Sequence, residues 1–453
     1  MKKKGRRMMA VALAIVFALT LSLGACSGGG DGGGGGGGDA AGAADSGGGP
    51  ATGGGGGSGD TIKIGYVLPL SGPMASFSIG GKGVKYVAEE ALKAINDERG
   101  GIEIDGQMMK VEVIWGDSES DPTKAQEVAT KLVTQDGVDM LFGEWTPATT
   151  SPVSAVGERN QVPTILANGP DTSWLEGAGA DGYQWSFGLF FDYDKFIDEY
   201  FNGWDKMETN KKVGLVLDSN VDGIGMAEIM AEKAPSRGYT IVDPGRFPEG
   251  TMDYMQVLTQ IQAEGCDILV ASLLNPELVT VWNQCQQINY IPKTAVLSKG
   301  MHMAVEVQAL GEGKGEGLCI ETQWSPQFPW LCSLNGKDAQ TLSDEYEAAV
   351  DASPDLELGW DWALWEVAYD AFSRAGSKDT EAVRQALIDT NLDSIYGNIT
   401  FLDNHVGHVP IVFGQWVPDD KWGYRKVILA ADWTPEVTEI TPPVYIPGYN
   451  SSN

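Results

Sequence analysis

Histidines are few in this chain, and its chemically reactive side chains match no catalytic motif. The three histidines are His302, His405 and His408. His405-x-x-His408 has a spacing that could hold a metal ion, but no Glu follows it and it lies in a glycine-containing loop, which indicates a surface turn. Gly223-x-Gly225 lacks the third glycine of a dinucleotide site and the Gly-Lys-Ser/Thr of a phosphate loop. We therefore predict no enzyme, no metal and no cofactor.

Polar and aromatic side chains occur instead at the ends of predicted strands, where they could bind a small molecule without changing it. The segment Glu144–Thr150 follows one strand and opens a helix. Free N–H groups and the helix dipole suit such a start to a carboxylate, although an ordinary capped helix has the same pattern. Asp222, Asn275 and Lys299 follow strands in the second half of the chain. These residues favour reversible binding.

The first sixty residues predict export and a tether. Basic residues at positions 2–7 precede an apolar run from Met8 to Leu23, which is too short for a stable membrane span and is typical of a secretory signal. The sequence LGAC at residues 23–26 resembles a bacterial lipobox, so we predict cleavage before Cys26 and its lipidation. Between residues 27 and 60, 20 of 34 positions are Gly, and such a segment is a random coil with a reach of about 30–35 Å. We expect a protein held on the outer face of the cytoplasmic membrane.

Charge and composition exclude several classes of function. The net charge of −31 would become −36 once the signal is removed, and this field repels phosphate backbones, so we predict no nucleic-acid partner. Hydrophobic content of 42% and 14 Trp can fill a large core. No later apolar run is long enough to span a membrane, so we predict membrane contact through the lipid anchor only.

Four cysteines follow Cys26, and their spacing fits no zinc pattern. Export makes disulfides possible. We predict a Cys319–Cys332 disulfide, because the residues between them have the composition of a loop that a bridge could close. Cys266 opens a strand and Cys285 lies in the next helix, so small core residues are one interpretation of this second pair and their pairing stays open.

From residue 61 onward, strands alternate with helices. Thr61–Leu68 is a β-branched strand, and Gly83–Asp97 carries apolar residues at helical spacing. Asp121 and Pro122 predict an N-cap followed by proline at the first helical position. The alternation restarts in the second half of the chain. Such series form parallel sheets with helices on both faces, and ligands bind outside the carboxyl ends of the strands.

Four stretches of this series resemble one family of receptors. They are PLSGP at residues 69–73, AINDERGGI at 94–102, GDSESDP at 116–122, and FG at 142–143 with QVP at 161–163. Together they make residues 61–433 similar to the Leu/Ile/Val-binding type of solute receptor, with the periplasmic binding protein type I fold, that serves ABC importers. The resemblance implies an α/β protein of two doubly wound parallel-sheet lobes, joined by a multi-strand hinge with three crossings, which close on a solute. Its partners would be a small-molecule solute, an ABC permease and the ATPase subunits of that permease, with the receptor itself a monomer.

The resemblance also sets the expected domain boundaries. They are 1–25 for the lipoprotein signal peptide, 26–60 for the lipidated Cys and tether, 61–188 plus about 322–396 for the first lobe, 189–321 plus about 397–433 for the second lobe, and 434–453 for a C-terminal tail.

The ligand contacts that the resemblance implies come from both lobes. Those of the first lobe are Phe77, which would cover the solute, then Trp145, Thr146 and Thr149 in the loop that holds a carboxylate in related receptors, and Asn168, Asp171 and Thr172 in a second clamp loop. Those of the second lobe are Asp222, Asn275 and Lys299. Trp362 would form an apolar wall, with core packing of Trp360, Trp362 and Trp365 as the alternative.

Lys299 departs from the pattern of the family, because related amino-acid receptors carry an acid near this position that pairs with the ammonium of the solute. A lysine there argues against an ordinary α-amino acid and favours a second anionic group, or an aromatic or aliphatic carboxylate; a solvated surface lysine is the alternative. The same fold also serves in ligand-sensing receptors without transport. The lipobox and the lack of an appended signalling domain favour uptake over sensing.

Overall fold

The computed structural model describes residues 61–75, 81–143, 145, 147–354, 357–439 and 442–448. The predicted signal peptide, Cys26 and the tether lie outside the described residues, as do Phe77 and Thr146. Asn168 is described through its backbone only. Across the described ranges, no helix combines the length and the apolar character that a membrane crossing requires.

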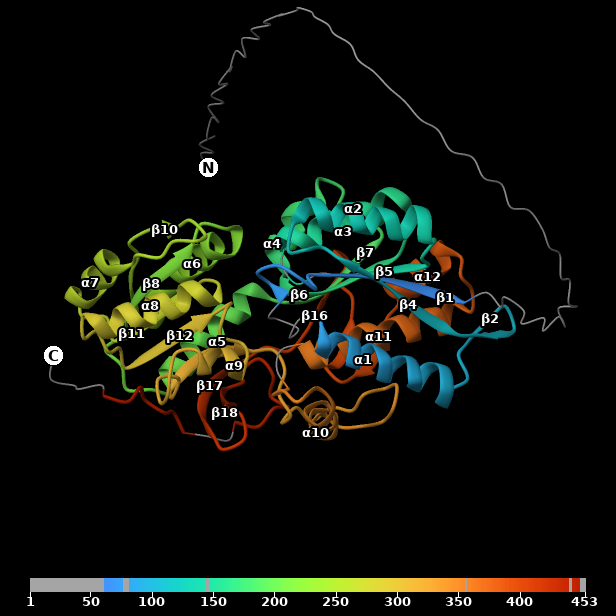
Figure 1. Cartoon of the computed structure of the whole chain (residues 1–453). Helices are drawn as coiled ribbons and strands as arrows, with labels where there is room; N and C mark the ends of the chain where they lie inside the picture. Colours follow the sequence, from blue (N-terminus) through green and yellow to red (C-terminus); the bar gives the residue numbers. More distant parts are fainter. Residues whose placement is uncertain are drawn as a thin grey trace, which may run out of the picture. The chain divides into compact units, whose positions relative to one another are not determined.

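The first lobe is built on a parallel sheet. Among the described residues its strands follow the order β16-β7-β6-β5-β1-β4, and each is parallel to its neighbours (Figure 1). The bounds are β1 Ile62–Leu68, β4 Val111–Asp117, β5 Met140–Gly143, β6 Thr164–Pro170, β7 Ser186–Phe191 and β16 Val406–His408.

Helices cover both faces of this sheet, as Figure 1 shows. One face carries α2 (Pro122–Lys131) and α3 (Pro147–Asn160), and the other carries α1 (Lys82–Lys93) and α11 (Glu357–Ala375). Successive side chains of a strand point to opposite faces. Val67 of β1 accordingly packs in a cluster with side chains of α2 and α3, whereas its neighbours in the strand pack in the cluster that contains α1 and α11.

The second lobe has a mixed sheet. In the described chain its order is β10-β8-β11-β12-β13-β17-β18, with β9 also paired to β8. Pairing is parallel from β10 to β13, whereas β17 pairs antiparallel with both β13 and β18. The prediction of a wholly parallel sheet therefore holds only for the part of this sheet up to β13. The bounds are β8 Lys212–Asp218, β9 Thr240–Val242, β10 Arg246–Phe247, β11 Ile268–Ser272, β12 Thr294–Ser298, β13 Leu318–Thr322, β17 Val412–Asp419 and β18 Gly423–Ala430.

The remaining elements connect or flank the two sheets. Those of the first lobe are β2 Ile102–Ile104, β3 Gln107–Met109, α4 Asp171–Leu175, α10 Ala339–Val350, α12 Thr380–Ile388, β14 Asn391–Ser394 and β15 Gly397–Thr400. Those of the second lobe are α5 Tyr193–Asp205, α6 Val221–Lys233, α7 Met255–Ala263, α8 Asn275–Gln287 and α9 Ala304–Gln308.

In the part of the chain that the structure describes, three connections join the lobes. They run from β7 to α5, from β13 to α10, and from β16 to β17. The third lies later than predicted, because β16 pairs with β7 in the first sheet, whereas the second lobe was expected to resume at about residue 397. A strand of three residues carries too little hydrophobic pattern to be separated from a loop.

Local signals explain where several helices begin. Asp121 accepts a hydrogen bond from the N–H of Lys124 at 2.8 Å and Pro122 is the first residue of α2, as predicted. Asp192 caps α5 in the same way through the N–H of Lys195 at 3.1 Å. The first inter-lobe crossing therefore ends at a fixed helix start.

The predicted Cys319–Cys332 disulfide is wrong, because both cysteines are free thiols. Cys319 lies inside β13, where its sulfur contacts Thr294 Oγ1 at 3.2 Å and accepts a bond from Gln415 Nε2 at 3.4 Å. Cys332 lies in the connection between β13 and α10 and packs in the core with first-lobe side chains. A strand residue fixed by its own sheet is not available to close the loop that follows it.

Tryptophans of α11 pack in the core of the first lobe beside Asp361, a buried acid of the same helix. Trp360, Trp362 and Trp365 are each at most 2% exposed, so the prediction that Trp362 forms a cleft wall is corrected in favour of core packing. Asp361 is 1% exposed and accepts a hydrogen bond from the hydroxyl of Tyr66 at 2.6 Å. Burial raises the pKa of Asp361 to about 7 against the opposing effect of that bond.

Candidate functional site

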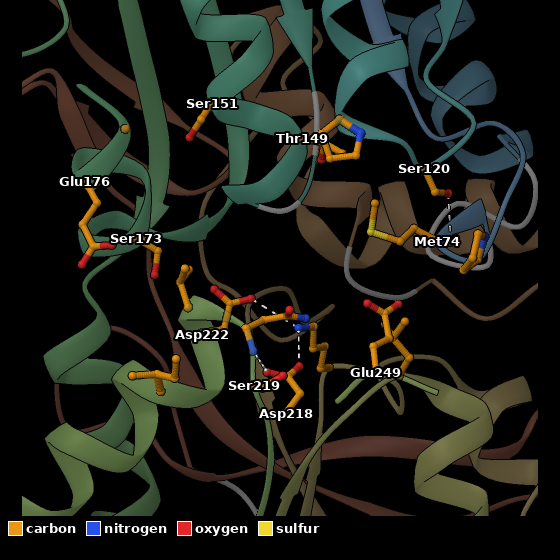
Figure 2. Close-up of a pocket in the computed structure, with 18 of the residues that line it drawn as sticks. Met74, Ser120, Thr149, Ser151, Ser173, Glu176, Asp218, Ser219, Asp222 and Glu249 are labelled. Atoms are coloured by element: carbon orange, nitrogen blue, oxygen red, sulfur yellow. Dashed lines mark hydrogen bonds and ion pairs between the residues drawn. The ribbon is translucent and has the colours of Figure 1, made fainter. Parts of the chain in front are cut away.

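A cavity of about 660 Å³ is lined by residues of both lobes. Its walls come from loops and helix starts at the carboxyl ends of parallel strands, which is where α/β sheets bind ligands. First-lobe residues in the lining include Met74, Ser120, Thr149, Ser173 and Glu176, and second-lobe residues include Asp218, Asp222, Glu249, Leu274 and Lys299. Figure 2 shows the labelled side chains around this space.

Three charged side chains of the second lobe form one ion-paired group. Lys299 Nζ lies 2.7 Å from Asp218 Oδ2 and 3.3 Å from Asp222 Oδ2. Asp218 ends β8, Asp222 lies in the first turn of α6, and Lys299 follows β12, so the sheet edge brings them together. Asp218 Oδ1 also accepts the N–H of Asn220 at 3.1 Å. The group holds two carboxylates for one ammonium.

This pairing determines the charge that Lys299 presents to the cavity. Burial alone lowers the pKa of Lys299, but the carboxylates of Asp222 and Asp218 outweigh that effect and hold it above its ordinary value. The ammonium is thus present and already neutralised. The positive charge expected at this wall from the sequence is replaced by a net negative one.

A strained turn holds Lys299 in place. Its φ of 73° lies in the left-handed region, which is uncommon for a residue with a Cβ and costs about 1 kcal/mol. At Gly300 a Cβ would overlap the backbone nitrogen of Asn275. Asn275 in turn donates from Nδ2 to the carbonyl of Gly300 at 2.9 Å. The backbone at Gly300 therefore lies directly against the start of α8, and only a glycine leaves room for this approach.

Helix α5, which follows the first connection between the lobes, fixes the start of α6 in the second-lobe wall of the cavity. The hydroxyl of Tyr193, the first residue of α5, donates to the carbonyl of Asp222 at 2.7 Å. Tyr193 is 3% exposed, and burial together with the nearby Asp222 carboxylate raises its pKa well above the ordinary value. The start of α6 is thus fixed by a neutral hydroxyl from the crossing segment.

The first-lobe wall is polar without any basic side chain in the described lining. Thr149 and Ser151 lie in the first turns of α3. The loop after β1 is tied to the loop after β4, because Ser120 Oγ accepts the N–H of Met74 at 3.1 Å and donates to the carbonyl of Ser71 at 2.9 Å. This wall offers hydroxyls and a helix start to a ligand.

Asp171 bonds to two crossing segments. Its Oδ1 accepts the N–H of Thr172 at 2.7 Å and that of Tyr193 at 3.2 Å. Its Oδ2 lies 3.0 Å from His408 Nε2, at the end of β16. Both oxygens therefore have partners among the described residues, Asp171 is not in the described lining of the cavity, and its role in ligand binding stays a prediction. The predicted surface turn is present, because the N–H of His405 donates to the carbonyl of Leu402 at 2.8 Å and residues 402–404 are exposed. The ring of His405 itself is buried, 7% exposed, and stacks on Phe187 with ring centroids 4.2 Å apart.

Some of the other residues predicted to bind the ligand line a cavity, and others do not. Thr149, Asp222 and Lys299 line the cavity, and Asn275 lines an adjoining cavity of about 400 Å³. Trp145 is buried and Thr172 is exposed, and neither is in the described lining of these two cavities. For Phe77, Thr146 and the Asn168 side chain, the ligand-binding role stays a prediction.

Sequence reasoning missed Asp218, Glu176 and Glu249. Asp218 could have been found, because it is the acidic last residue of a buried parallel strand and points to the edge where ligands bind. Glu176 begins a single 3₁₀ turn after the short helix α4, and Glu249 lies in a turn after β10. Segments this short carry no periodicity that gives a side chain its direction.

Comparisons with known proteins agree with this architecture. A family model described as periplasmic binding protein matches residues 61–421. A Leu/Ile/Val-binding protein, BraC3, of Rhizobium johnstonii is 26% identical over 389 residues, covering 82% of this chain and 94% of that protein. Leu/Ile/Val-binding protein homolog 3 of Brucella melitensis is 27% identical over 353 residues, covering 75% of this chain and 87% of the relative.

Solved structures share the fold at lower identity. LivJ of Streptococcus pneumoniae, a branched-chain amino acid transporter substrate-binding protein in complex with isoleucine, aligns with a TM-score of 0.68 at 21% identity, covering 82% of this chain and 99% of LivJ. A solute-binding protein of an ABC transporter from Rhodopseudomonas palustris, in complex with 3,4-dihydroxybenzoic acid, aligns with a TM-score of 0.65 at 17% identity, covering 86% and 99%. The chain therefore belongs to the periplasmic binding protein family, and it is a solute-binding protein of the type that Leu/Ile/Val-binding proteins represent, not an enzyme.

Proposed function

We propose that this chain is the membrane-anchored substrate-binding subunit of an ABC transporter, which traps a small organic solute between its lobes and delivers it to a permease. The observation that carries this proposal is the cavity of about 660 Å³ lined from both lobes. That volume lies within the range of small-molecule pockets, about 300–1,000 Å³.

Binding and closure are one equilibrium in this proposal. A solute that touches Thr149 on one wall and Asp222 on the other makes both contacts only when the lobes approach each other. It therefore shifts the population towards the closed form by the free energy of the second set of contacts. The three connections between the sheets are the segments in which the backbone bends.

A carboxylate is the group that the first-lobe wall favours. The start of α3 contributes Thr149 and Ser151 to the lining, and a helix start attracts negative charge. The ligands named for the two structural neighbours, isoleucine and 3,4-dihydroxybenzoic acid, both carry a carboxylate. We extend this feature to the solute of this chain.

A thermal-shift screen of the mature protein against amino acids, amides, dicarboxylates and aromatic acids tests the proposal. A solute present at 100 times its dissociation constant raises the free energy of unfolding by about 2.7 kcal/mol, because it binds only the folded protein. A panel without any stabilising solute would contradict solute capture. If a solute binds but a strain lacking this protein takes it up normally, a sensing receptor of the same fold replaces transport.

The anchor has a separate test. Replacing Cys26 with Ser removes the thiol that lipidation requires, so we expect the protein to move from the membrane fraction to the soluble fraction. Two or more acyl chains hold a protein stably, and their loss leaves an acidic chain that anionic lipids repel. Membrane association that survives this substitution would exclude the lipid anchor. Solute affinity should be unchanged, because the site lies in residues 73–299.

A further inference from the structure

The charged side chains around the inter-lobe cavity are nearly all acidic. Among the lining residues that the structure describes, the carboxylates are Glu176, Asp218, Asp222, Glu249 and Glu277, and the one ammonium is that of Lys299. In Figure 2, Asp218 and Asp222 lie between Glu176 on one side and Glu249 on the other. The formal charge of the lining is −4. A cleft concentrates such a field and raises the local concentration of cations.

Lys299 does not offset this field for a ligand. Its Nζ contacts Asp218 and Asp222, and its side chain is 16% exposed. An anionic group that used Lys299 would have to replace two carboxylates that have no other cation in the described structure. The cost of leaving a charge of this kind unpaired is several kcal/mol.

Asp222 supplies a position for a ligand cation. One of its oxygens contacts Lys299, whereas Oδ1 is buried and has no hydrogen-bond partner among the described residues. The helix start of α6 and the Tyr193 bond to its carbonyl fix the backbone of Asp222. A buried acceptor without a donor is costly, and a rotation of the Asp222 carboxylate towards the cavity would let it accept from an ammonium or guanidinium of the solute.

The first-lobe wall offers a binding position for one negative group of the solute. The start of α3 suits one carboxylate, and no described first-lobe residue of the lining is basic. A zwitterion would satisfy this helix start and one acid of the second lobe, and would leave the rest of the acidic lining without a counter-charge.

We propose that the solute carries a net positive charge, with an ammonium or guanidinium group beyond any that balances a carboxylate, and that Asp222 is the residue that selects it. This inference rests on the proposed function and names its substrate class. It also reverses the anionic solute that Lys299 suggested in the sequence.

Matched probes that differ in charge test the inference on the mature protein. L-Arginine and L-citrulline have nearly the same shape, as do L-lysine and L-norleucine, while agmatine and putrescine lack a carboxylate and L-glutamate is anionic. By calorimetry we expect cationic members to bind at least tenfold more tightly than their neutral partners, and rising salt to weaken them. Asp222→Asn should weaken the best cationic probe by about 10- to 100-fold. Glu228→Gln is the control, because Glu228 lies on the same helix, is exposed and is not in the described lining of the cavity. The affinity of this variant for the cationic probe should be unchanged.

The outcomes separate the two proposals. A neutral or anionic solute that binds more tightly than every cationic probe overturns the charge inference and leaves solute capture intact. Equal losses in Asp222→Asn and Glu228→Gln would assign the effect to long-range charge and remove the selecting role of Asp222. No binding by any probe, in this set or in the wider screen, would contradict both proposals.

Discussion

Replacing Lys299 with Met lowers the free energy of unfolding by about 3 kcal/mol. The substitution keeps the length of the side chain but leaves Asp218, 6% exposed, and Asp222, 20% exposed, without their shared cation. Breaking a buried ion pair costs about 3–5 kcal/mol, and the residual exposure of Asp222 places this case at the lower end. Urea denaturation at neutral pH measures the loss.

Two further variants make this prediction specific. Asp218→Asn added to Lys299→Met should recover at least half of the loss, because only one carboxylate then remains. Lys233→Met is the matched control: Lys233 also contacts two carboxylates, at 3.1 and 3.0 Å, but Asp194 is 65% exposed. Its loss should stay below about 1 kcal/mol. Equal losses at Lys299 and Lys233 would mean that the cavity group is not a buried pair.

Replacing Asp361 with Asn stabilises the protein at pH 8 and makes its stability less dependent on pH. The pKa of Asp361 is raised by burial to about 7, against about 3.9 in an unfolded chain. Between these values the folded state holds a proton that the unfolded state has released, so stability falls as pH rises from about 4 to 7. Three pKa units correspond to about 4 kcal/mol. Asn keeps the acceptor for Tyr66 and has no charge to bury.

Denaturation at pH 5 and at pH 8 checks this prediction. Glu366 and Glu199, whose pKa values burial raises to about 7, remain in both proteins, so the difference between wild type and Asp361→Asn isolates one group. Asp370→Asn is the control on the same helix, where the acid pairs with Arg374 at 2.6 Å and is 23% exposed. If Asp361→Asn lowers stability equally at both pH values, the buried carboxyl is ionised and has a partner.

The sequence predicted the elements that repeat and missed those that join the lobes. The strand at Thr61–Leu68 and the capped helix after Asp121 follow from periodicity and a cap residue, which are local properties. Strands β7, β13 and β16 were not predicted, although they lead into the three crossings. They are short, buried stretches whose direction is set by a neighbouring strand far away in the sequence.

At the site, too, the positions of single residues could be predicted from local sequence, whereas their contacts with distant residues could not. Asp222 and Lys299 were placed at the edge of the sheet because each follows a strand, and the structure puts both in the cavity lining. Their mutual pairing was not foreseeable, because it depends on the left-handed turn at Lys299 and on residues 77 positions apart. The bonds of Asp171 could not be foreseen for a similar reason: its partners Tyr193 and His408 come from later parts of the chain.

The bonds of Asp171 have a consequence for the entropy of closing. One carboxylate connects the start of α5 to the end of β16, so these two backbone segments cannot bend independently while it is intact. If the lobes close on a solute as proposed, we expect the solute-free protein to sample fewer relative orientations, so that less disorder is lost on capture. More of the free energy of the solute contacts is then left to hold the solute.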